Sequence, residues 1–186
     1  MNGLDSNQLA NALGHLINKR WAKLAGVCAR DEIAGVVKKA EQDDAFPLCL
    51  ISNTDTSKGD GEHWVALYLH SMHECEFFDS YGCNPSVYHI DIPCKHYHLA
   101  NKRTLQSQLS SVCGHYCLFY LSYRSRGFHS DRIFHCFTSG SLRHNDAVVR
   151  RSVIKLLKRA PSFAIPHPCF TAHNQSCKCR DSCNFY

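Results

Sequence analysis

Four stretches of the chain place apolar residues three or four positions apart, the spacing that gathers side chains on one face of a helix. This pattern predicts helices over residues 6–19, 30–40, 113–126 and 146–160. Three of these helices begin near residues that commonly cap a helix N-terminus: Asp5 or Ser6, Ser110 or Ser111, and Asn145 or Asp146. Gly127 and Pro161 follow the last two helices, as is typical of residues that end a helix.

Between the second and third of these helices, the apolar residues form short runs of the kind found in buried strands. The runs predict strands over residues 46–52, 63–69 and 75–82, and one further strand at either 88–92 or 97–101. The linker between the second and third strands is short enough for a hairpin. Helices before and after a group of strands predict an α+β fold, in which a small mixed sheet is flanked by helices.

The composition suits a soluble globular protein, since 44% of the 186 residues are hydrophobic and 20% are charged. We expect one folded domain over residues 1–163 and a tail over 164–186 that follows no period. No window approaches the roughly 18 uncharged apolar residues of a membrane span, and the first residues do not resemble a secretory signal. The expected location is the cytosol or nucleus, where most of the 12 cysteines would be reduced core residues.

The formal net charge of +5 has two interpretations. The basic residues either form an ordinary solvated surface or attract a polyanion such as nucleic acid. Five of them fall within ten residues of the last predicted helix: Arg150, Arg151, Lys155, Lys158 and Arg159.

Cys113 stands where a polar segment gives way to the most apolar of the predicted helices, which we expect to be central and buried. At a helix N-terminus, exposed N–H groups and the helix dipole favour negative charge, so the pKa of the thiol is expected to fall. The same N–H groups can hold an oxyanion, and Gly114 would let a substrate backbone come close. The alternative is that Cys113 packs in the core like Cys117, one turn later.

A thiolate nucleophile also needs a base and a group that orients the base. His63 opens a predicted strand, and Asp79, 16 residues later, ends the next strand of the predicted hairpin, so antiparallel pairing would bring them together. Gln106 or Gln108 can supply an oxyanion donor upstream of the cysteine. Each has an ordinary alternative, because the chain has 13 histidines, an aspartate can cap a turn and glutamines can be solvated loop residues.

These residues stand in a pattern that resembles the adenovirus-type maturation cysteine proteases, the adenain family. Two segments carry the resemblance, GEHWVALYLHSMHECEFFDSYG and LQSQLSSVCGHYC. In that family a His-Trp pair opens a strand, an acidic residue ends the next strand, and a glutamine precedes Cys-Gly at a helix start. Supporting likeness covers most of residues 4–163. Proteases that remove ubiquitin-like modifiers share this layout, but their glutamine usually lies six residues before the cysteine rather than seven.

The resemblance implies a cysteine endopeptidase with Cys113 as the nucleophile, His63 as the general base and Asp79 as its orienting carboxylate. It also implies that Gln106 and the Cys113 backbone N–H form the oxyanion hole. Adenain-like enzymes have a glutamate where this chain has Asp79. The aspartate therefore favours the modifier proteases, whereas the chain length and the glutamine spacing favour the viral type.

Family substrates are viral precursor proteins, cut at glycine-containing sites during virion maturation. The resemblance places Trp64 and Gly114 at the bound substrate, and it implies action in the host nucleus and the virion. A monomer without a membrane partner is the default expectation. The alternative within the same class is a deconjugating protease for a ubiquitin-like modifier.

Family members need no cofactor for the chemistry, but they are activated by viral DNA and by a peptide linked through a cysteine upstream of the nucleophile. Cys94 lies one residue from that cysteine's position, and it is equally well placed as a structural cysteine beside Pro93. The basic residues of the last predicted helix fit contact with DNA, in which case activity would fall as salt rises.

A different class of function also fits part of the chain, a non-enzymatic protein that binds nucleic acid or zinc. It would use the basic helix and the tail, which contains Cys177, Cys179 and Cys183. Their C-x-C-x3-C spacing is not the usual C-x2-C pair of structural zinc sites, so no metal site is predicted.

Overall fold

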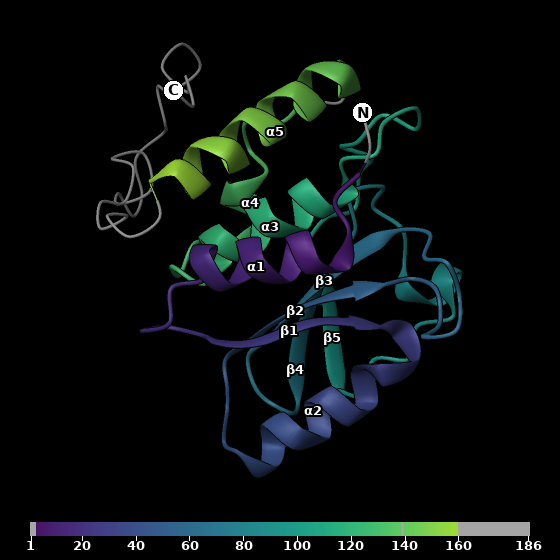
Figure 1. Cartoon of the computed structure of the whole chain (residues 1–186), viewed down its shortest axis with the longest axis vertical. Coiled ribbons are helices and arrows are strands. Elements are labelled where there is room, and N and C mark those ends of the chain that lie inside the picture. The colour runs from purple at the N-terminus through teal and green to yellow at the C-terminus, as the bar shows by residue number, and fades with distance from the viewer. Residues whose placement is uncertain (1–2, 139, 160–186) are drawn as a thin grey trace.

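In the computed structural model, which describes residues 3–138 and 140–159, five strands form one mixed sheet in the order β1-β2-β3-β4-β5 (Figure 1). The central pairs β2–β3 and β3–β4 are antiparallel, and the outer pairs β1–β2 and β4–β5 are parallel. The strands are β1 (Lys23–Ala29), β2 (Leu48–Asn53), β3 (Trp64–Leu69), β4 (Glu74–Phe78) and β5 (His96–Leu99). The predicted α+β fold with a small mixed sheet is confirmed.

Helices cover both faces of this sheet, with α1, α3, α4 and α5 on one face and α2 on the other (Figure 1). Their bounds are α1 (Ser6–Leu16), α2 (Ile33–Gln42), α3 (Cys113–Arg124), α4 (Ser130–Ile133) and α5 (Leu142–Lys158), and short 3-10 helices span Arg30–Glu32 and Pro85–Tyr88. Along β2, Cys49 and Ile51 pack with the first group, whereas Leu48 and Leu50 pack with α2. Because both faces are covered, the strand appears in the sequence as a continuous apolar run.

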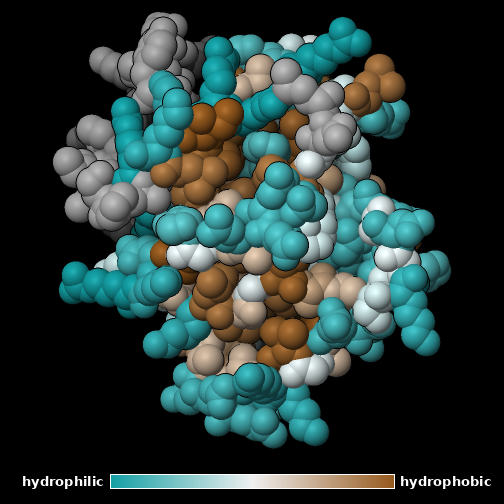
Figure 2. All heavy atoms as spheres, in the orientation of Figure 1, coloured by the Kyte–Doolittle hydropathy of each residue, from teal (hydrophilic) through white to brown (hydrophobic). Residues whose placement is uncertain are grey.

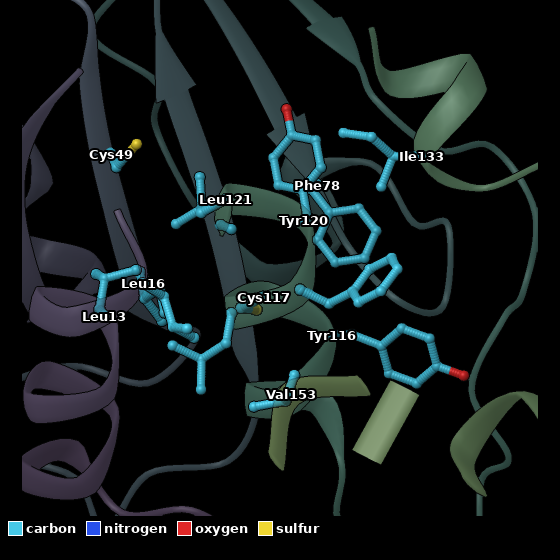
Figure 3. Packing of buried hydrophobic residues seen from close by; sticks show 14 of the residues in the cluster. Leu13, Leu16, Cys49, Phe78, Tyr116, Cys117, Tyr120, Leu121, Ile133 and Val153 are labelled. Atoms are coloured by element: carbon cyan, nitrogen blue, oxygen red, sulfur yellow. The ribbon is translucent and has the colours of Figure 1, made fainter. Parts of the chain in front are cut away.

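Helix α3 is the centre of the larger core, and it is buried on every side rather than along one stripe. Figure 3 shows Leu13 and Leu16 of α1 beside Cys117, with Phe78 of β4 close to Tyr120. The rings of Phe78 and Tyr120 stack with their centroids 4.9 Å apart. The first residue of α3 is therefore fixed relative to both α1 and the sheet. None of the helices within the described residues has the length and apolarity needed to cross a bilayer.

Strand β1 is the strand that the sequence pattern missed, and the short helix α4 is also absent from the predicted elements. A shift of register between Leu24 and Gly26 interrupts its pairing with β2, and Gly26 has a positive φ of 109°. Such an irregularity breaks the alternation on which strand prediction depends. As an edge strand it is only partly covered, and Figure 2 shows hydrophobic side chains at the surface between α1 and α2, where β1 lies.

The remaining predicted elements are present, with corrections at their ends. The fifth strand is the later of the two candidates, since residues 85–88 form a 3-10 helix instead. Asp5 caps α1 as expected and forms a capping box with Gln8. The caps predicted for the other two helices are wrong, because Val112 precedes α3 and α5 begins four residues earlier than expected, after Ser141. The side chains of Asn145 and Asp146 instead bond to neighbouring segments, among them Leu105 and Ser107.

A buried ion pair ties the far end of α3 to the sheet. Glu76 of β4 accepts two hydrogen bonds from Arg124, each of 2.8 Å, and one of 2.6 Å from the Tyr120 hydroxyl. His70 lies 3.1 Å from the same carboxylate. Burial raises the pKa of Glu76, but the hydrogen bonds from His70, Arg124 and Tyr120 together hold it well below its usual range. The carboxylate is therefore a permanent charge in the folded protein.

We expect Glu76→Gln to lower the free energy of unfolding by about 3 kcal/mol, because it leaves the Arg124 guanidinium buried without a counter-charge. Since the pKa of Glu76 is lowered on folding, this contribution is complete above the unfolded value of about 4.3 and is lost as pH falls. Urea denaturation at pH 7 and at about pH 2, well below the unfolded pKa, measures both effects. Glu74→Gln, at an exposed position of the same strand, is the control. Equal stabilities of the two variants would contradict the role of the pair.

Candidate active site

The β3–β4 hairpin brings His63 and Asp79 together as the sequence predicts. His63 immediately precedes β3, Asp79 follows β4, and Ala66 pairs with Phe78 across the two strands. The Nε2 atom of His63 lies 2.7 Å from Oδ1 of Asp79, and both residues are buried. The contact needs only local strand pairing, which explains why it could be anticipated.

Asp79 serves both of the roles that its sequence context suggested. Its carboxylate accepts hydrogen bonds from the backbone N–H groups of Tyr81 and Cys83, at 3.1 and 2.9 Å, as a turn-capping aspartate does. It also accepts one from the Tyr88 hydroxyl at 3.0 Å. Burial raises the pKa of Asp79, but the hydrogen bond with His63 and these donors lower it overall. The carboxylate is therefore ionised and fixed in direction.

Two tyrosines hold the imidazole of His63 from its faces. Tyr81 stacks on it with ring centroids 4.9 Å apart, and the Tyr88 ring lies at 5.6 Å. Burial alone lowers the pKa of His63, but its hydrogen bonds with Asp79 and Cys113 raise it to about 9. The sequence reasoning missed Tyr88, which belongs to a short 3-10 helix with no motif of its own.

Cys113 is the first residue of α3, it is partly buried, and its thiol interacts electrostatically with His63. Because Nε2 of His63 faces Asp79, Nδ1 is the ring nitrogen left for the sulfur. Burial raises the pKa of Cys113, but the hydrogen bond and charge of His63, with the backbone N–H groups of Trp64 and Gly114, lower it overall. A thiolate facing an imidazolium is the arrangement of an activated nucleophile.

Gln106 lies in the segment between β5 and α3 with its amide group fixed at both ends. The Ser80 hydroxyl donates to Oε1 at 2.7 Å, and Nε2 donates to the Ser110 carbonyl at 2.8 Å. This arrangement orients the amide nitrogen toward the segment that leads into Cys113. Gln108 is exposed. The geometry suits Gln106 as the oxyanion donor, and that role stays a prediction.

The structure gives Trp64 and Gly114 contacts within the chain itself. The indole N–H of Trp64 donates to the carbonyl of Leu4 at 3.1 Å. A Cβ added to Gly114 would come within 2.9 Å of the Leu9 side chain and 3.5 Å of Leu4. The missing side chain at Gly114 thus allows α1 to pack against α3. The approach of a substrate backbone to Gly114 stays a prediction, as does the contact of Trp64 with a substrate.

The residues that the family resemblance assigned to activators lie outside this cluster. Cys94 is partly buried, and its interaction with the Cys75 thiol of β4 lowers its pKa. On α5, Arg151, Lys158 and Arg159 are exposed, whereas Arg150 and Lys155 are partly buried. Contact of these residues with a peptide or DNA stays a prediction.

The predicted tail at 164–186 lies outside the described residues, and so do its cysteines. Within residues 3–138 and 140–159, no group of three or more His, Cys, Asp or Glu side chains is placed to hold a metal ion.

No family model matches the chain. Over 117 residues, which is 54% of this chain and 42% of the other, it is 30% identical to a cysteine protease of African swine fever virus. It thus spans less than half of that relative's length. The similarity is to a viral cysteine protease, and nothing in it singles out the adenovirus type.

Among solved structures, the fold resembles the central domain of an uncharacterized Legionella pneumophila protein. The TM-score is 0.52 at 16% identity, and the match covers 86% of this chain and 98% of that one. A crystal structure of the African swine fever virus protease gives a TM-score of 0.35 at 20% identity, over 53% of this chain and 41% of the other.

We predict that iodoacetamide modifies Cys113 at pH values well below the pKa of about 8.5 of a free cysteine. His63→Ala should move the midpoint of the pH–rate profile upward, because the imidazolium that stabilises the thiolate is gone. Rates measured by mass spectrometry of the modified cysteine test this expectation. His98→Ala, at an exposed histidine of β5, should leave the profile unchanged. An unaltered midpoint in His63→Ala would refute the ion pair.

Proposed function

We propose that this chain is a cysteine endopeptidase that uses Cys113, His63 and Asp79. One observation carries the proposal: the imidazole before β3 is hydrogen-bonded to the carboxylate after β4, and it interacts with the thiol at the start of α3, whose pKa it lowers. The similarity to a viral cysteine protease, over part of that protein, agrees with this chemistry.

In the proposed reaction, the Cys113 thiolate attacks the carbonyl carbon of the scissile peptide bond. The carbonyl oxygen becomes an oxyanion, which the Gln106 amide and the Cys113 backbone N–H stabilise. The His63 imidazolium then gives its proton to the leaving amine as the C–N bond breaks. A water molecule, deprotonated by His63, hydrolyses the thioester and restores the thiolate.

Asp79 would keep the His63 ring in the tautomer and orientation that this proton transfer needs. Its side chain is one methylene shorter than the glutamate of adenain-like enzymes, yet it reaches His63 directly at 2.7 Å. Both members of the pair are largely shielded from water, and the four donors around the carboxylate leave it little freedom to rotate.

As natural substrates we propose viral precursor proteins, cut at glycine-containing sites during virion maturation. The second candidate is a protease for a ubiquitin-like modifier, which the direct contact between an aspartate and His63 favours. A modifier protease should cleave a folded ubiquitin-like fusion much faster than a short Gly-Gly peptide. A maturation protease should cleave the peptide, and polyanions bound to the basic side of α5 should stimulate it in a salt-dependent manner.

Cys113→Ala should reduce cleavage of Gly-Gly reporter peptides by at least about 10³-fold, because it removes the thiol that interacts with His63. Release of a fluorophore from the peptide, with and without added DNA, measures the loss. Cys28→Ala serves as the control, because Cys28 lies on β1 and burial raises the pKa of its thiol to about 11. Full activity in Cys113→Ala would refute the proposed function.

A further inference from the structure

Residues 105–111, here called the oxyanion segment, carry Gln106 but contain no helix or strand. One side of this segment is anchored on Ser80, just after β4. The Ser80 carbonyl accepts hydrogen bonds from the backbone N–H groups of Leu105 and Gln106, at 2.8 and 3.2 Å. The Ser80 hydroxyl also bonds to the Gln106 side chain, so Ser80 holds one side of the oxyanion segment.

The other side of the oxyanion segment is held by two buried residues of α5. The amide nitrogen of Asn145 donates to the Leu105 carbonyl at 3.1 Å and to the Thr138 carbonyl at 2.7 Å. The carboxylate of Asp146 accepts from the Ser107 N–H at 3.3 and 3.4 Å. The residues immediately before and after Gln106 are thus both bonded to α5.

Tyr116 joins the nucleophile's helix to the same point. It lies three residues after Cys113 on α3, and its hydroxyl is 2.9 Å from the Leu105 carbonyl and 3.2 Å from the Asp146 carboxylate. Asp146 is therefore shared between the segment that carries Gln106 and the helix that carries Cys113. Any displacement of its carboxylate would alter the distance between the two.

The burial of Asp146 carries a desolvation cost. A buried carboxylate loses its hydration, and only well-placed donors offset that loss. At an exposed helix start, an aspartate would gain from the helix dipole without this penalty. Asp146 is instead 9% exposed and Asn145 is 1% exposed, and both side chains bond to the oxyanion segment.

We infer that Asp146 is a positioning residue, which acts through Ser107 and Tyr116 to set the Gln106 amide relative to the Cys113 sulfur. Asn145 supports it by fixing Leu105. The inference rests on the proposed function, because it assigns the residue a part in oxyanion stabilisation. It predicts that Asp146 affects acyl transfer without affecting the intrinsic reactivity of the thiol.

The test compares two reactions of the same thiol in the full-length chain. Asp146→Ala should lower kcat for a Gly-Gly reporter by about 10²-fold with little change in KM, as expected for a misplaced catalytic group. Alkylation of Cys113 by iodoacetamide forms no oxyanion, so its rate and pH profile should stay as in the wild type. Asp146→Asn, which keeps an acceptor for the Ser107 N–H, should recover part of kcat and guards against a folding defect in the alanine variant.

A double-mutant cycle with Gln106→Ala identifies the route of the effect. If Asp146 acts through Gln106, the double variant should be no slower than Gln106→Ala alone. Ser152→Ala, which alters another buried polar residue of α5, should leave kcat unchanged. Additive losses in the cycle, an equal loss of alkylation rate, or full kcat in Asp146→Ala would overturn the inference. A wild-type chain that cleaves no peptide would contradict the proposed function itself.

Discussion

The burial of α3 is the constraint on which the rest of the structure depends. The helix packs against α1 and α5 and lies on β3, so its start is fixed to the strand that His63 precedes. Apolar packing is not directional, so it holds the helix in the core without setting where the helix lies along its own axis. The Glu76–Arg124 ion pair at the far end of α3 sets that position. The position of the Cys113 thiol, at the start of α3, therefore depends on contacts throughout the core.

Two buried carboxylates, one in β4 and one just after it, differ in behaviour because their partners differ. Glu76 faces a guanidinium that is always charged, so it contributes a fixed ion pair. Asp79, three residues later, faces an imidazole that can gain and lose a proton. Both have lowered pKa values, yet only the second pairing can take part in proton transfer.

How much the sequence predicts depends on how local each interaction is. The contact of His63 with Asp79 follows from one hairpin, and residue patterns were enough to predict it. The approach of Cys113 to this pair joins distant segments, and only the family resemblance indicated it. The sequence predicts Asn145 or Asp146 as a helix cap, because capping preferences depend on neighbouring residues in the chain. They carry no information on the buried partners that bond to these side chains in the fold. Strand β1 was missed because its irregular pairing removes the expected alternation.

One contact makes the residues just before α1 sensitive to substitution. The backbone at Gly3 lies against the carbonyl of Ser111, and the next residue, Leu4, accepts the indole hydrogen bond of Trp64. Ser111 stands two positions ahead of the reactive sulfur. Substitutions at Gly3 or Leu4 would therefore disturb the backbone that leads into Cys113 as well as the packing of α1.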